Sequence, residues 1–345
     1  MAVQQREAVY LTQYPQGAPT PADFMTKSYE VGEPGPDEML LRTVWMSVDP
    51  YMRGRMRPDV KSYIPPFALN EPLSGGAVSE VITSNVDGFA PGDYIVDFEG
   101  GWKSHYLSKG EGARKVDPNL APLSAYLGVL GMPGMTAWVG VSQIMKPRAG
   151  ETMFVSGAAG AVGSVVCQLG KVAGSRVVAS AGSKEKCDWL VNEAGVDVAI
   201  NYKDHADAAA LTKALAKAAP DGVDTYFENV GGMHLEAALN CIAAGGRIAL
   251  CGMIALYNNT APVPGPSNLI NIIGRGVTVR GFIVSEFMNQ AGAFAAEVAP
   301  LILSGKVKYQ ETEYDGLSNA STAFIDLFSG GNAGKAVIRV GADRI

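Results

Sequence analysis

The sequence predicts an α/β protein of two domains, in which a mostly-β domain is joined to a doubly wound parallel sheet. Residues 1 to about 125 are rich in Gly and Pro and contain short β-type runs separated by turns. From about residue 130, apolar strands alternate with helical stretches, a pattern typical of a parallel sheet covered by helices on both faces. The length of 345 residues and the 47% hydrophobic content allow two buried cores.

The first of these regions carries runs such as MLLRTVWMSV, GAVSEVI and DYIVDF, with turns such as EPGPDE and APGD between them. After Ile302 the chain again shows strands and turns, in KVKYQETEY and KAVIRV. The simplest arrangement returns this tail to the N-terminal domain. We therefore expect a mostly-β domain at 1–126, a domain with the parallel sheet at 127–300, and a C-terminal return at 301–345.

Composition argues against several classes of protein. The formal net charge is -6 and no Lys/Arg cluster is present, so a nucleic-acid binder is not expected. The first residues, MAVQQREAVYLTQ, mix charged and polar side chains where a secretory signal would be apolar, and we expect a cytoplasmic protein. No uninterrupted run of about 18 apolar residues predicts a membrane span. The 4 cysteines form no CxxC pair, which favours reduced thiols in the core.

A cofactor turn is predicted after the first strand of the second region. Gly157, Gly160 and Gly163 lie between a β-type run and an apolar-faced helix, in a total of about six strands typical of a Rossmann sheet. Here Gly160 would let the backbone approach a pyrophosphate held at the helix N-terminus, and Gly163 would allow close packing. The spacing is GxxGxxG, and alone it also fits a tight turn in any α/β protein. The strand before it and the helix after it favour the cofactor turn.

The end of the next strand indicates which dinucleotide binds. An NAD site places a carboxylate about 20 residues after the glycines, to bind the ribose 2′-hydroxyl. No acid stands at this strand end, although Glu185 follows in the helix; Ser183 and Lys186 suit a 2′-phosphate instead. NADPH is therefore the predicted cofactor. The alternative is that Lys184 and Lys186 are ordinary solvated charges on a helix.

Several motifs together resemble a known family. The segments SGAAGAVGSVVCQLGK, AGSKEKCDWL, INYK, YFENVGG, CGMI and RGFIV are similar to those of the medium-chain dehydrogenase/reductase superfamily. The N-terminal VDPYMRGRM resembles the zinc-free branch that holds prostaglandin reductases, plant double-bond reductases and bacterial NADPH-dependent curcumin reductases. The resemblance spans nearly the whole chain. It implies a GroES-like catalytic domain, a Rossmann domain that binds NADPH or NADP+, and a homodimer built through the nucleotide-domain sheet.

The same resemblance implies roles for individual residues. The pyrophosphate would lie on the glycine turn, the 2′-phosphate and adenosine beside Lys186 and Tyr202, and the nicotinamide end along the segments after the later strands. The implied cofactor residues are Gly160, Ala161, Val162, Gly163, Ser183, Lys186, Tyr202, Asn229, Cys251, Gly252, Met253, Ile254, Ala255, Leu256, Tyr257, Phe282, Ile283, Val284 and Asn332. The chain departs from the pattern at Glu228, where Asp is usual, and the charge is retained.

Metal ligands are not expected. Zinc-dependent alcohol dehydrogenases need Cys and His ligands in the catalytic domain, and a structural zinc needs closely spaced thiolates. The first 125 residues contain no Cys, and their only His is His105. We interpret His105 as structural, and His205 and His234 as surface or core residues. Alcohol oxidation would need a Lewis acid, whereas hydride addition to a conjugated alkene does not.

Two tyrosines are candidates for catalysis. Hydride addition to the β-carbon of an enone or enal leaves negative charge on the carbonyl oxygen, which needs a hydrogen-bond donor. A tyrosine is uncharged at neutral pH and can donate a hydrogen bond or a proton. We expect Tyr257 to stabilise the enolate or donate the proton, and Tyr51 to orient the carbonyl group or shape the pocket. Alternatively, either ring is only a pocket wall.

The predicted substrate is a small conjugated carbonyl compound. Residues Tyr63–Phe67 and the Pro262–Pro266 loop would line an apolar mouth, and Arg53 and Arg55 would either attract an acidic tail or bind backbone groups. Two other functions stay open. One is a quinone reductase of the same superfamily, which would share the cofactor site. The other is a non-catalytic NADPH-binding protein.

Overall fold

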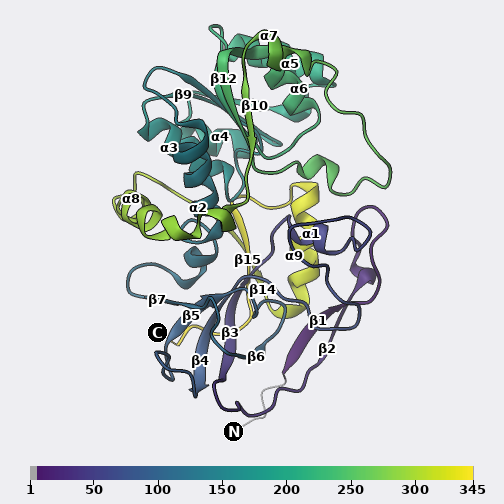
Figure 1. Cartoon of the computed structure of the whole chain (residues 1–345), viewed down its shortest axis with the longest axis vertical. Coiled ribbons are helices and arrows are strands. Elements are labelled where there is room, and N and C mark those ends of the chain that lie inside the picture. Colours follow the sequence, from purple (N-terminus) through teal and green to yellow (C-terminus); the bar gives the residue numbers. More distant parts are fainter. Residues whose placement is uncertain (1–5, 345) are drawn as a thin grey trace. The chain divides into compact units, whose positions relative to one another are not determined.

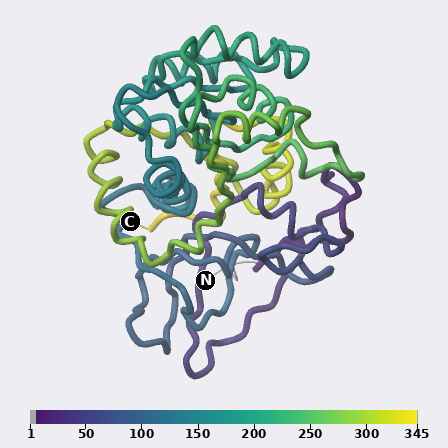
Figure 2. The backbone as a smooth tube through the Cα atoms, turned by 45° about the horizontal axis from the view of Figure 1, so that its top comes forward, coloured from purple at the N-terminus to yellow at the C-terminus, as the bar shows by residue number. Residues whose placement is uncertain are grey.

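The computed structural model describes residues 6–344, and its contacts group the chain into two compact units. Unit 1 ends at Gly128 and resumes at Glu311, whereas unit 2 is the continuous segment Val129–Gln310. Figure 2 follows unit 2 along the tube from teal to yellow-green. The domain limits expected from the sequence, 1–126, 127–300 and 301–345, stay predictions.

Unit 1 is built on a seven-stranded sheet whose strands come from both ends of the chain. Strand β15 (Lys335–Arg339) pairs antiparallel with β3 (Met39–Ser47), so a C-terminal strand lies beside an N-terminal one, as Figure 1 shows. The order is β14-β15-β3-β4-β5-β7, and β6 also pairs with β3. The remaining strands of this sheet are β4 (Ala77–Ser84), β5 (Tyr94–Asp97), β6 (His105–Ser108), β7 (Arg114–Val116) and β14 (Glu311–Asp315). A separate two-stranded sheet pairs β1 (Glu7–Leu11) with β2 (Phe24–Ser28).

One core of unit 1 gathers side chains that are far apart in the sequence. Trp102 is fully buried, and its ring stacks on Phe24 with the centroids 5.9 Å apart. Phe324 meets both rings edge-on, and Met52 belongs to the same cluster. The helices of this unit are η1 (Pro21–Asp23), α1 (Met52–Arg55), η2 (Leu123–Leu127), η7 (Leu317–Asn319) and α9 (Ala320–Ser329). The core of unit 1 is therefore complete only when the C-terminal chain is in place.

Unit 2 holds a six-stranded sheet in the order β10-β9-β8-β11-β12-β13, and every neighbouring pair is parallel. The order reverses between β8 and β11, as in a Rossmann sheet. The strands are β8 (Thr152–Val155), β9 (Arg176–Ala181), β10 (Val198–Asn201), β11 (Val223–Glu228), β12 (Ile242–Leu250) and β13 (Thr278–Gly281). The α-helices are α2 (Met132–Trp138), α3 (Gly163–Val172), α4 (Lys184–Asn192), α5 (Ala208–Ala218), α6 (Met233–Cys241), α7 (Ile270–Gly274) and α8 (Ala291–Leu303). The shorter or irregular helices are η3 (Val139–Met145), η4 (Tyr202–Asp204), η5 (Ile254–Leu256) and η6 (Val284–Gln290).

Both faces of the parallel sheet are covered. Successive side chains of a strand point to opposite faces. Phe154 of β8 and Tyr226 of β11 stack with the centroids 5.0 Å apart, and they pack in one core with residues of α5 and α6. Met153, the neighbour of Phe154, lies on the other face, where a Cβ on Gly170 of α3 would be 2.8 Å from its sulfur. The doubly wound parallel sheet that the sequence predicts is confirmed, and the other unit is mostly β.

No helix within residues 6–344 combines the length and the apolar character needed to cross a membrane.

Candidate functional site

The glycine turn lies between β8 and α3, where the sequence predicts it. Gly157 has a φ of +57°, which favours glycine. A Cβ on Gly163 would lie 2.7 Å from the Cα of Ala158, so only glycine fits at the first residue of α3. A Cβ on Gly160 would meet nothing closer than the Gly157 carbonyl oxygen at 3.3 Å. The side chain of Val162, the N-cap residue, makes no capping hydrogen bond to the first turn. An anion such as a pyrophosphate fits this helix N-terminus.

The predicted cofactor residues of unit 2 all follow the carboxyl ends of its strands. In a parallel sheet these ends share one edge, which is where ligands bind in doubly wound folds. The glycine turn follows β8, Ser183 follows β9, Tyr202 follows β10 and Asn229 follows β11. The segment that ends at Tyr257 follows β12, and the segment from Phe282 to Val284 follows β13. The fold therefore brings these predicted residues to one edge of the sheet.

One buried carboxylate organises the centre of this edge. The Ser156 hydroxyl donates to Oε1 of Glu228 at 2.7 Å and accepts from the Asn229 amide at 2.9 Å. The same Oε1 accepts the N–H groups of Val230 at 2.6 Å and Gly231 at 2.9 Å. Burial raises the pKa of Glu228 above the usual range of a glutamate. The carboxyl group thus joins the end of β8 to the turn after β11.

Asn229 is held by this network through its side chain as well. Its Nδ2 donates to the Ser156 carbonyl oxygen at 2.7 Å. Its own carbonyl oxygen accepts from Ile254 N–H at 3.1 Å, which links it to the segment after β12. The expected place of Asn229 along the cofactor stays a prediction.

Basic and hydroxyl side chains gather at the other end of the edge, around Gly182. Ser183 caps α4 and accepts from the Lys186 amide at 3.3 Å. The Tyr202 ring and the Lys203 side chain both approach Gly182, since a Cβ there would be 3.1 Å from Tyr202 Cε1 and 3.3 Å from Lys203 Cε. Burial and the nearby Lys203 ammonium lower the pKa of Lys186. Two ammonium groups near one helix N-terminus suit a phosphate group.

Lys184, by contrast, forms an ion pair on the surface of its own helix. Its Nζ lies 2.5 Å from Asp188 Oδ2, one turn along α4, and the side chain is exposed. The alternative interpretation of a solvated helix charge therefore applies to Lys184, whereas Lys186 is half-buried and its role stays a prediction.

The segment from Cys251 to Tyr257 wraps around the turn after β11. The N–H groups of Cys251 and Gly252 donate to the Glu228 carbonyl oxygen at 3.0 and 3.1 Å, and Ala255 N–H donates to Val230 at 3.0 Å. Tyr257 is half-buried, and its hydroxyl oxygen accepts the Met253 N–H at 3.4 Å. Burial raises its pKa, so the phenol keeps its proton at neutral pH. A hydroxyl group whose oxygen accepts an N–H still has its own proton to donate.

Phe282, Ile283 and Val284 follow β13. The Phe282 ring is buried and meets Phe227 edge-on with the centroids 6.2 Å apart. Ile283 is the N-cap residue of η6, and its carbonyl oxygen accepts from Glu286 N–H at 3.1 Å. Packing of Phe282 thus fixes the backbone of this segment at the sheet edge.

Comparison with known proteins places this fold and edge in a family. Residues 7–116 match the family described as the N-terminal domain of oxidoreductase, and residues 161–301 match the zinc-binding dehydrogenase family. The chain is 40% identical over 338 residues to the NADPH-dependent curcumin reductase of Escherichia coli (strain K12), which covers 96% of each chain. The chain belongs to the medium-chain dehydrogenase/reductase superfamily.

Further similarities extend over nearly the whole length of this medium-chain dehydrogenase/reductase. It is 41% identical over 331 residues to a 2-alkenal reductase (NADP+-dependent) of Nicotiana tabacum, which covers 96% of this chain and 95% of the relative. The crystal structure of CurA from Vibrio vulnificus in complex with NADPH matches with a TM-score of 0.91 and 38% identity. That match covers 98% of this chain and 100% of CurA. The predicted fold class and the predicted family branch are confirmed.

The three histidines of this medium-chain dehydrogenase/reductase belong to different segments of the chain. His105 is a buried residue of β6, and burial lowers its pKa to about 4. His205 follows η4, and His234 is buried in α6. Across residues 6–344, no three His, Cys, Asp or Glu side chains form a group that could hold a metal ion.

Tyr51 and Asn332 belong to unit 1, not to the unit that holds the other predicted site residues. Tyr51 is the residue before α1, is half-buried, and packs against the core that contains Trp102. Burial raises its pKa, and the nearby Arg55 guanidinium opposes that shift. Asn332 lies in the loop before β15 and donates to the Gly334 carbonyl oxygen at 2.9 Å. The roles of both residues stay predictions.

A buried ion pair lies close in sequence to both of these residues: Asp49 precedes Tyr51, and Lys335 follows Asn332. Lys335 Nζ lies 3.2 Å from Asp49 Oδ1, and both side chains are almost fully buried. The same ammonium donates to the carbonyl oxygens of Val48 at 2.8 Å and Ala336 at 2.9 Å. Lys335 thus connects the segment that precedes Tyr51 with the loop that contains Asn332.

The basic side chains after Tyr51 bind backbone groups. Arg53 is buried and donates to the Gly17 carbonyl oxygen at 2.7 Å, while Arg55 donates to Pro65 at 3.0 Å. The Phe67 ring lies in the core with the Arg55 guanidinium 3.9 Å from its centroid, so it does not line a mouth. A hollow of about 430 Å³ does adjoin this region, lined by Gly54, Arg57, Pro58, Val60, Lys61, Ser62, Tyr63, Ile64, Pro65 and Pro66.

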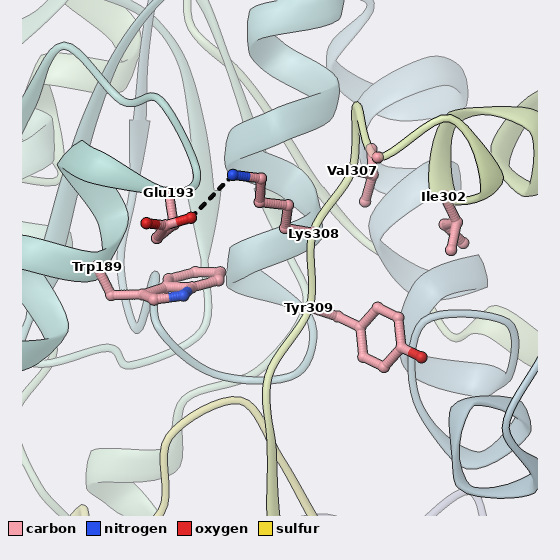
Figure 3. A pocket seen from close by; sticks show the side chains of 7 residues that line it. Trp189, Glu193, Ile302, Val307, Lys308 and Tyr309 are labelled. Carbon is pink, nitrogen blue, oxygen red and sulfur yellow. Dashed lines mark hydrogen bonds and ion pairs between the residues drawn. The ribbon is translucent and has the colours of Figure 1, made fainter.

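A larger hollow in unit 2 lies away from the predicted residues. It has a volume of about 610 Å³ and is lined by Trp189 in α4, Glu193 after it, Ile302 in α8, and four residues of the chain after α8. Figure 3 shows Trp189 beside the ion pair of Lys308 with Glu193, whose atoms are 2.8 Å apart. None of the predicted cofactor or catalytic residues lines it.

Sequence reasoning did not single out Lys203 as a binding residue and assigned only a surface or core role to His234. Lys203 directly follows Tyr202 in INYK, so the motif contained a signal for a second ammonium group at this end of the sheet edge. His234 carried no such signal, because its contacts with Ser180 and Tyr202 join segments that are far apart in the sequence.

Proposed function

We propose that this protein reduces the carbon-carbon double bond of small α,β-unsaturated ketones and aldehydes with NADPH. The observation that carries the proposal is the edge of the parallel sheet, where the glycine turn, the basic end and the segment of Tyr257 all follow the carboxyl ends of its strands. Relatives that are 40% and 41% identical are named NADPH-dependent curcumin reductase and 2-alkenal reductase, which supports this class of substrate.

The residues present fit the proposed cofactor. Gly160, which has no side chain, and the N-terminus of α3, which has no side-chain cap, suit a pyrophosphate, and Ser183, Lys186 and Lys203 suit a 2′-phosphate. Tyr202 would flank the adenosine, and the segments after β12 and β13 would border the nicotinamide. Bound NADPH would supply the hydride that forms the new C–H bond at the β-carbon of the substrate.

Tyr257 is the proposed donor to the substrate. As the β-carbon gains a hydride, the double bond shifts toward the carbonyl group and an enolate oxygen forms. The Tyr257 hydroxyl, protonated at neutral pH, would hold that oxygen by a hydrogen bond or pass its proton on. A proton from Tyr257 or from solvent water then forms the C–H bond at the α-carbon, and the C=O bond of the saturated carbonyl product is restored. Tyr51 would orient the carbonyl group before the transfer.

We also propose a cytoplasmic homodimer formed at the free edge of the parallel sheet. β13 is hydrogen-bonded to β12 on one side only, and all four of its residues are exposed. Large apolar side chains stand out beside it, with Ile270 68% and Ile273 77% exposed on α7. An exposed edge strand with apolar neighbours can pair with its copy across a two-fold axis. The four cysteines are free thiols, which supports the cytoplasmic location.

The test is an assay of NADPH oxidation against separate panels of alkenals, aryl and cyclic enones, and quinones. The proposal expects turnover of the enones and enals, with mass spectrometry showing saturation of the double bond. Turnover of quinones alone would support the quinone reductase alternative. Tight NADPH binding without oxidation across all panels would instead support a non-catalytic protein.

A further inference from the structure

His234 is a buried residue at the start of α6, next to the basic end of the sheet edge. Its exposed fraction is 1%, and it follows two glycines of positive φ, Gly231 at +77° and Gly232 at +55°. The Glu228 carboxylate binds the N–H of Gly231, so the turn that leads into α6 is fixed. The backbone therefore leaves the imidazole little freedom.

A single hydrogen bond anchors the ring. His234 Nε2 lies 2.9 Å from the hydroxyl oxygen of Ser180, which is fully buried near the end of β9. The carbonyl oxygen of Ser180 accepts the Ala158 N–H at 2.9 Å, so Ser180 also touches the glycine turn. Nδ1 has no hydrogen-bond partner among the described residues, and burial lowers the pKa of His234 to about 4. The neutral imidazole with Nε2–H donating to Ser180 avoids a buried unpaired N–H.

The imidazole meets Tyr202 at close range. The ring centroids are 4.9 Å apart and the planes are inclined by 71°, an edge-to-face contact. The Tyr202 ring also borders Gly182, where a Cβ would lie only 3.1 Å from Tyr202 Cε1. Tyr202 thus contacts both a glycine and an anchored histidine.

We infer that His234 is a positioning residue for the cofactor, which acts by fixing the Tyr202 ring in the place that an adenosine packs against. This inference rests on the proposed NADPH site. Ser180 holds the imidazole, the imidazole holds the tyrosine, and the ammonium groups of Lys186 and Lys203 lie beside them to take the phosphate. His234 touches neither the substrate nor the nicotinamide end in this arrangement.

The experiment measures the dissociation constants of NADPH, NADH and adenosine 2′,5′-bisphosphate by calorimetry, and kcat at saturating NADPH. We expect His234→Ala to weaken the binding of all three ligands by the same factor, about three- to tenfold, because the lost contact is aromatic. kcat should stay at the wild-type value. Lys186→Ala should weaken NADPH and the bisphosphate but leave NADH unchanged, since only the phosphate contact is lost.

A matched control separates positioning from loss of stability. Leu239 lies in the same helix and is fully buried, so Leu239→Ala should destabilise the fold and leave the three dissociation constants unchanged. Ser180→Ala removes only the anchor, and we expect it to weaken binding by a smaller factor than His234→Ala. Ser180→Ala also tests the inference if His234→Ala does not fold.

A double variant decides whether His234 acts through Tyr202. In Tyr202→Ala protein, the further change His234→Ala should have no effect on the dissociation constants. Two results would overturn the inference about His234 but not the proposed function. One is that the effects of the two substitutions on the dissociation constants multiply in the double variant. The other is that binding is unchanged in both His234→Ala and Ser180→Ala. Failure of the wild-type protein to bind adenosine 2′,5′-bisphosphate or NADPH would overturn the proposed function and this inference with it.

Discussion

The two units hold their predicted functional residues in different ways. In unit 2 these residues follow strand ends within short segments, and backbone groups fix them, as when Glu228 binds the turn after its own strand. In unit 1 the position of Tyr51 depends on residues that are distant in sequence, because Lys335 binds Asp49 and Val48 in the segment before Tyr51. Phe324 likewise completes the core against which Tyr51 packs.

This difference predicts how each unit should respond to change. A local arrangement tolerates changes elsewhere but fails when its own glycines or short hydrogen bonds are altered. An arrangement built from distant segments fails when a single buried connection is broken. Variants in the two units should therefore separate chemistry and binding from stability.

The largest effect is expected for Tyr257→Phe. Loss of the phenolic proton donor should lower kcat on an enone by about 10²- to 10⁴-fold, with little change in the affinity for NADPH. Steady-state kinetics checks this against Tyr314→Phe, which removes a hydroxyl bonded to Asp326 in unit 1. If kcat of Tyr257→Phe equals the wild-type value, the Tyr257 ring serves only as a wall of the pocket. Tyr51→Phe should mainly raise the KM of the substrate.

Lys335→Met should be the most destabilising change in unit 1. It leaves the Asp49 carboxylate buried without its cation, at a cost of about 3–5 kcal/mol in the free energy of unfolding. Urea denaturation measures the loss, and Asp49→Asn combined with Lys335→Met should recover part of it. Equal loss in the single and double variants would contradict the buried ion pair as the cause.

Two glycines of the cofactor turn should separate packing from binding. Gly163→Ala places a Cβ 2.7 Å from the Ala158 Cα and should cost about 3 kcal/mol of stability. Gly160→Ala meets only the Gly157 oxygen at 3.3 Å, so the fold should survive while the new methyl group obstructs the pyrophosphate. Thermal unfolding and NADPH titration distinguish the two. Normal NADPH affinity in Gly160→Ala would place the pyrophosphate elsewhere.

The smallest effect is expected in acid. Folded His234 has a pKa of about 4, below the ordinary value of 6.5, so the unfolded chain binds this proton first as the pH falls. The stability from neutral His234 is complete above about pH 6.5 and is lost as the pH falls toward 4. From about pH 7 to about pH 5, wild type should lose about 2 kcal/mol relative to His234→Ala. Urea denaturation of both proteins at both pH values checks this. If wild type and His234→Ala lose the same free energy of unfolding between these pH values, His234 is not buried as the neutral imidazole.

Much of unit 2 could be predicted from sequence because its signals are local. The alternation of strand and helix predicted the parallel sheet, and a glycine turn between a strand and a helix predicted a phosphate site without knowledge of other segments. Lys184 and Lys186 look alike in sequence, and only the structure shows that one is paired with Asp188 and the other is half-buried.

The details of unit 1 were less accessible for a physical reason. Arg53, Arg55 and Phe67 stand in a short polar and apolar stretch that is compatible with a substrate mouth. Their partners, such as the Gly17 carbonyl oxygen and the Trp102 cluster, are distant in sequence and leave no periodic signal. The same applies to His234, whose contacts come from β9 and η4.

The single oxygen of Glu228 that binds Ser156, Val230 and Gly231 has a practical consequence for protein engineering. The segment after β12, proposed to border the nicotinamide, is bonded to the turn that this oxygen holds, so a substitution there disturbs several segments at once and its effects should not add. Ser183, Lys186 and Lys203 have no part in those bonds. A redesign from NADPH toward NADH can therefore be confined to the proposed phosphate end, and Tyr257, the proposed donor to the substrate, can be left unchanged.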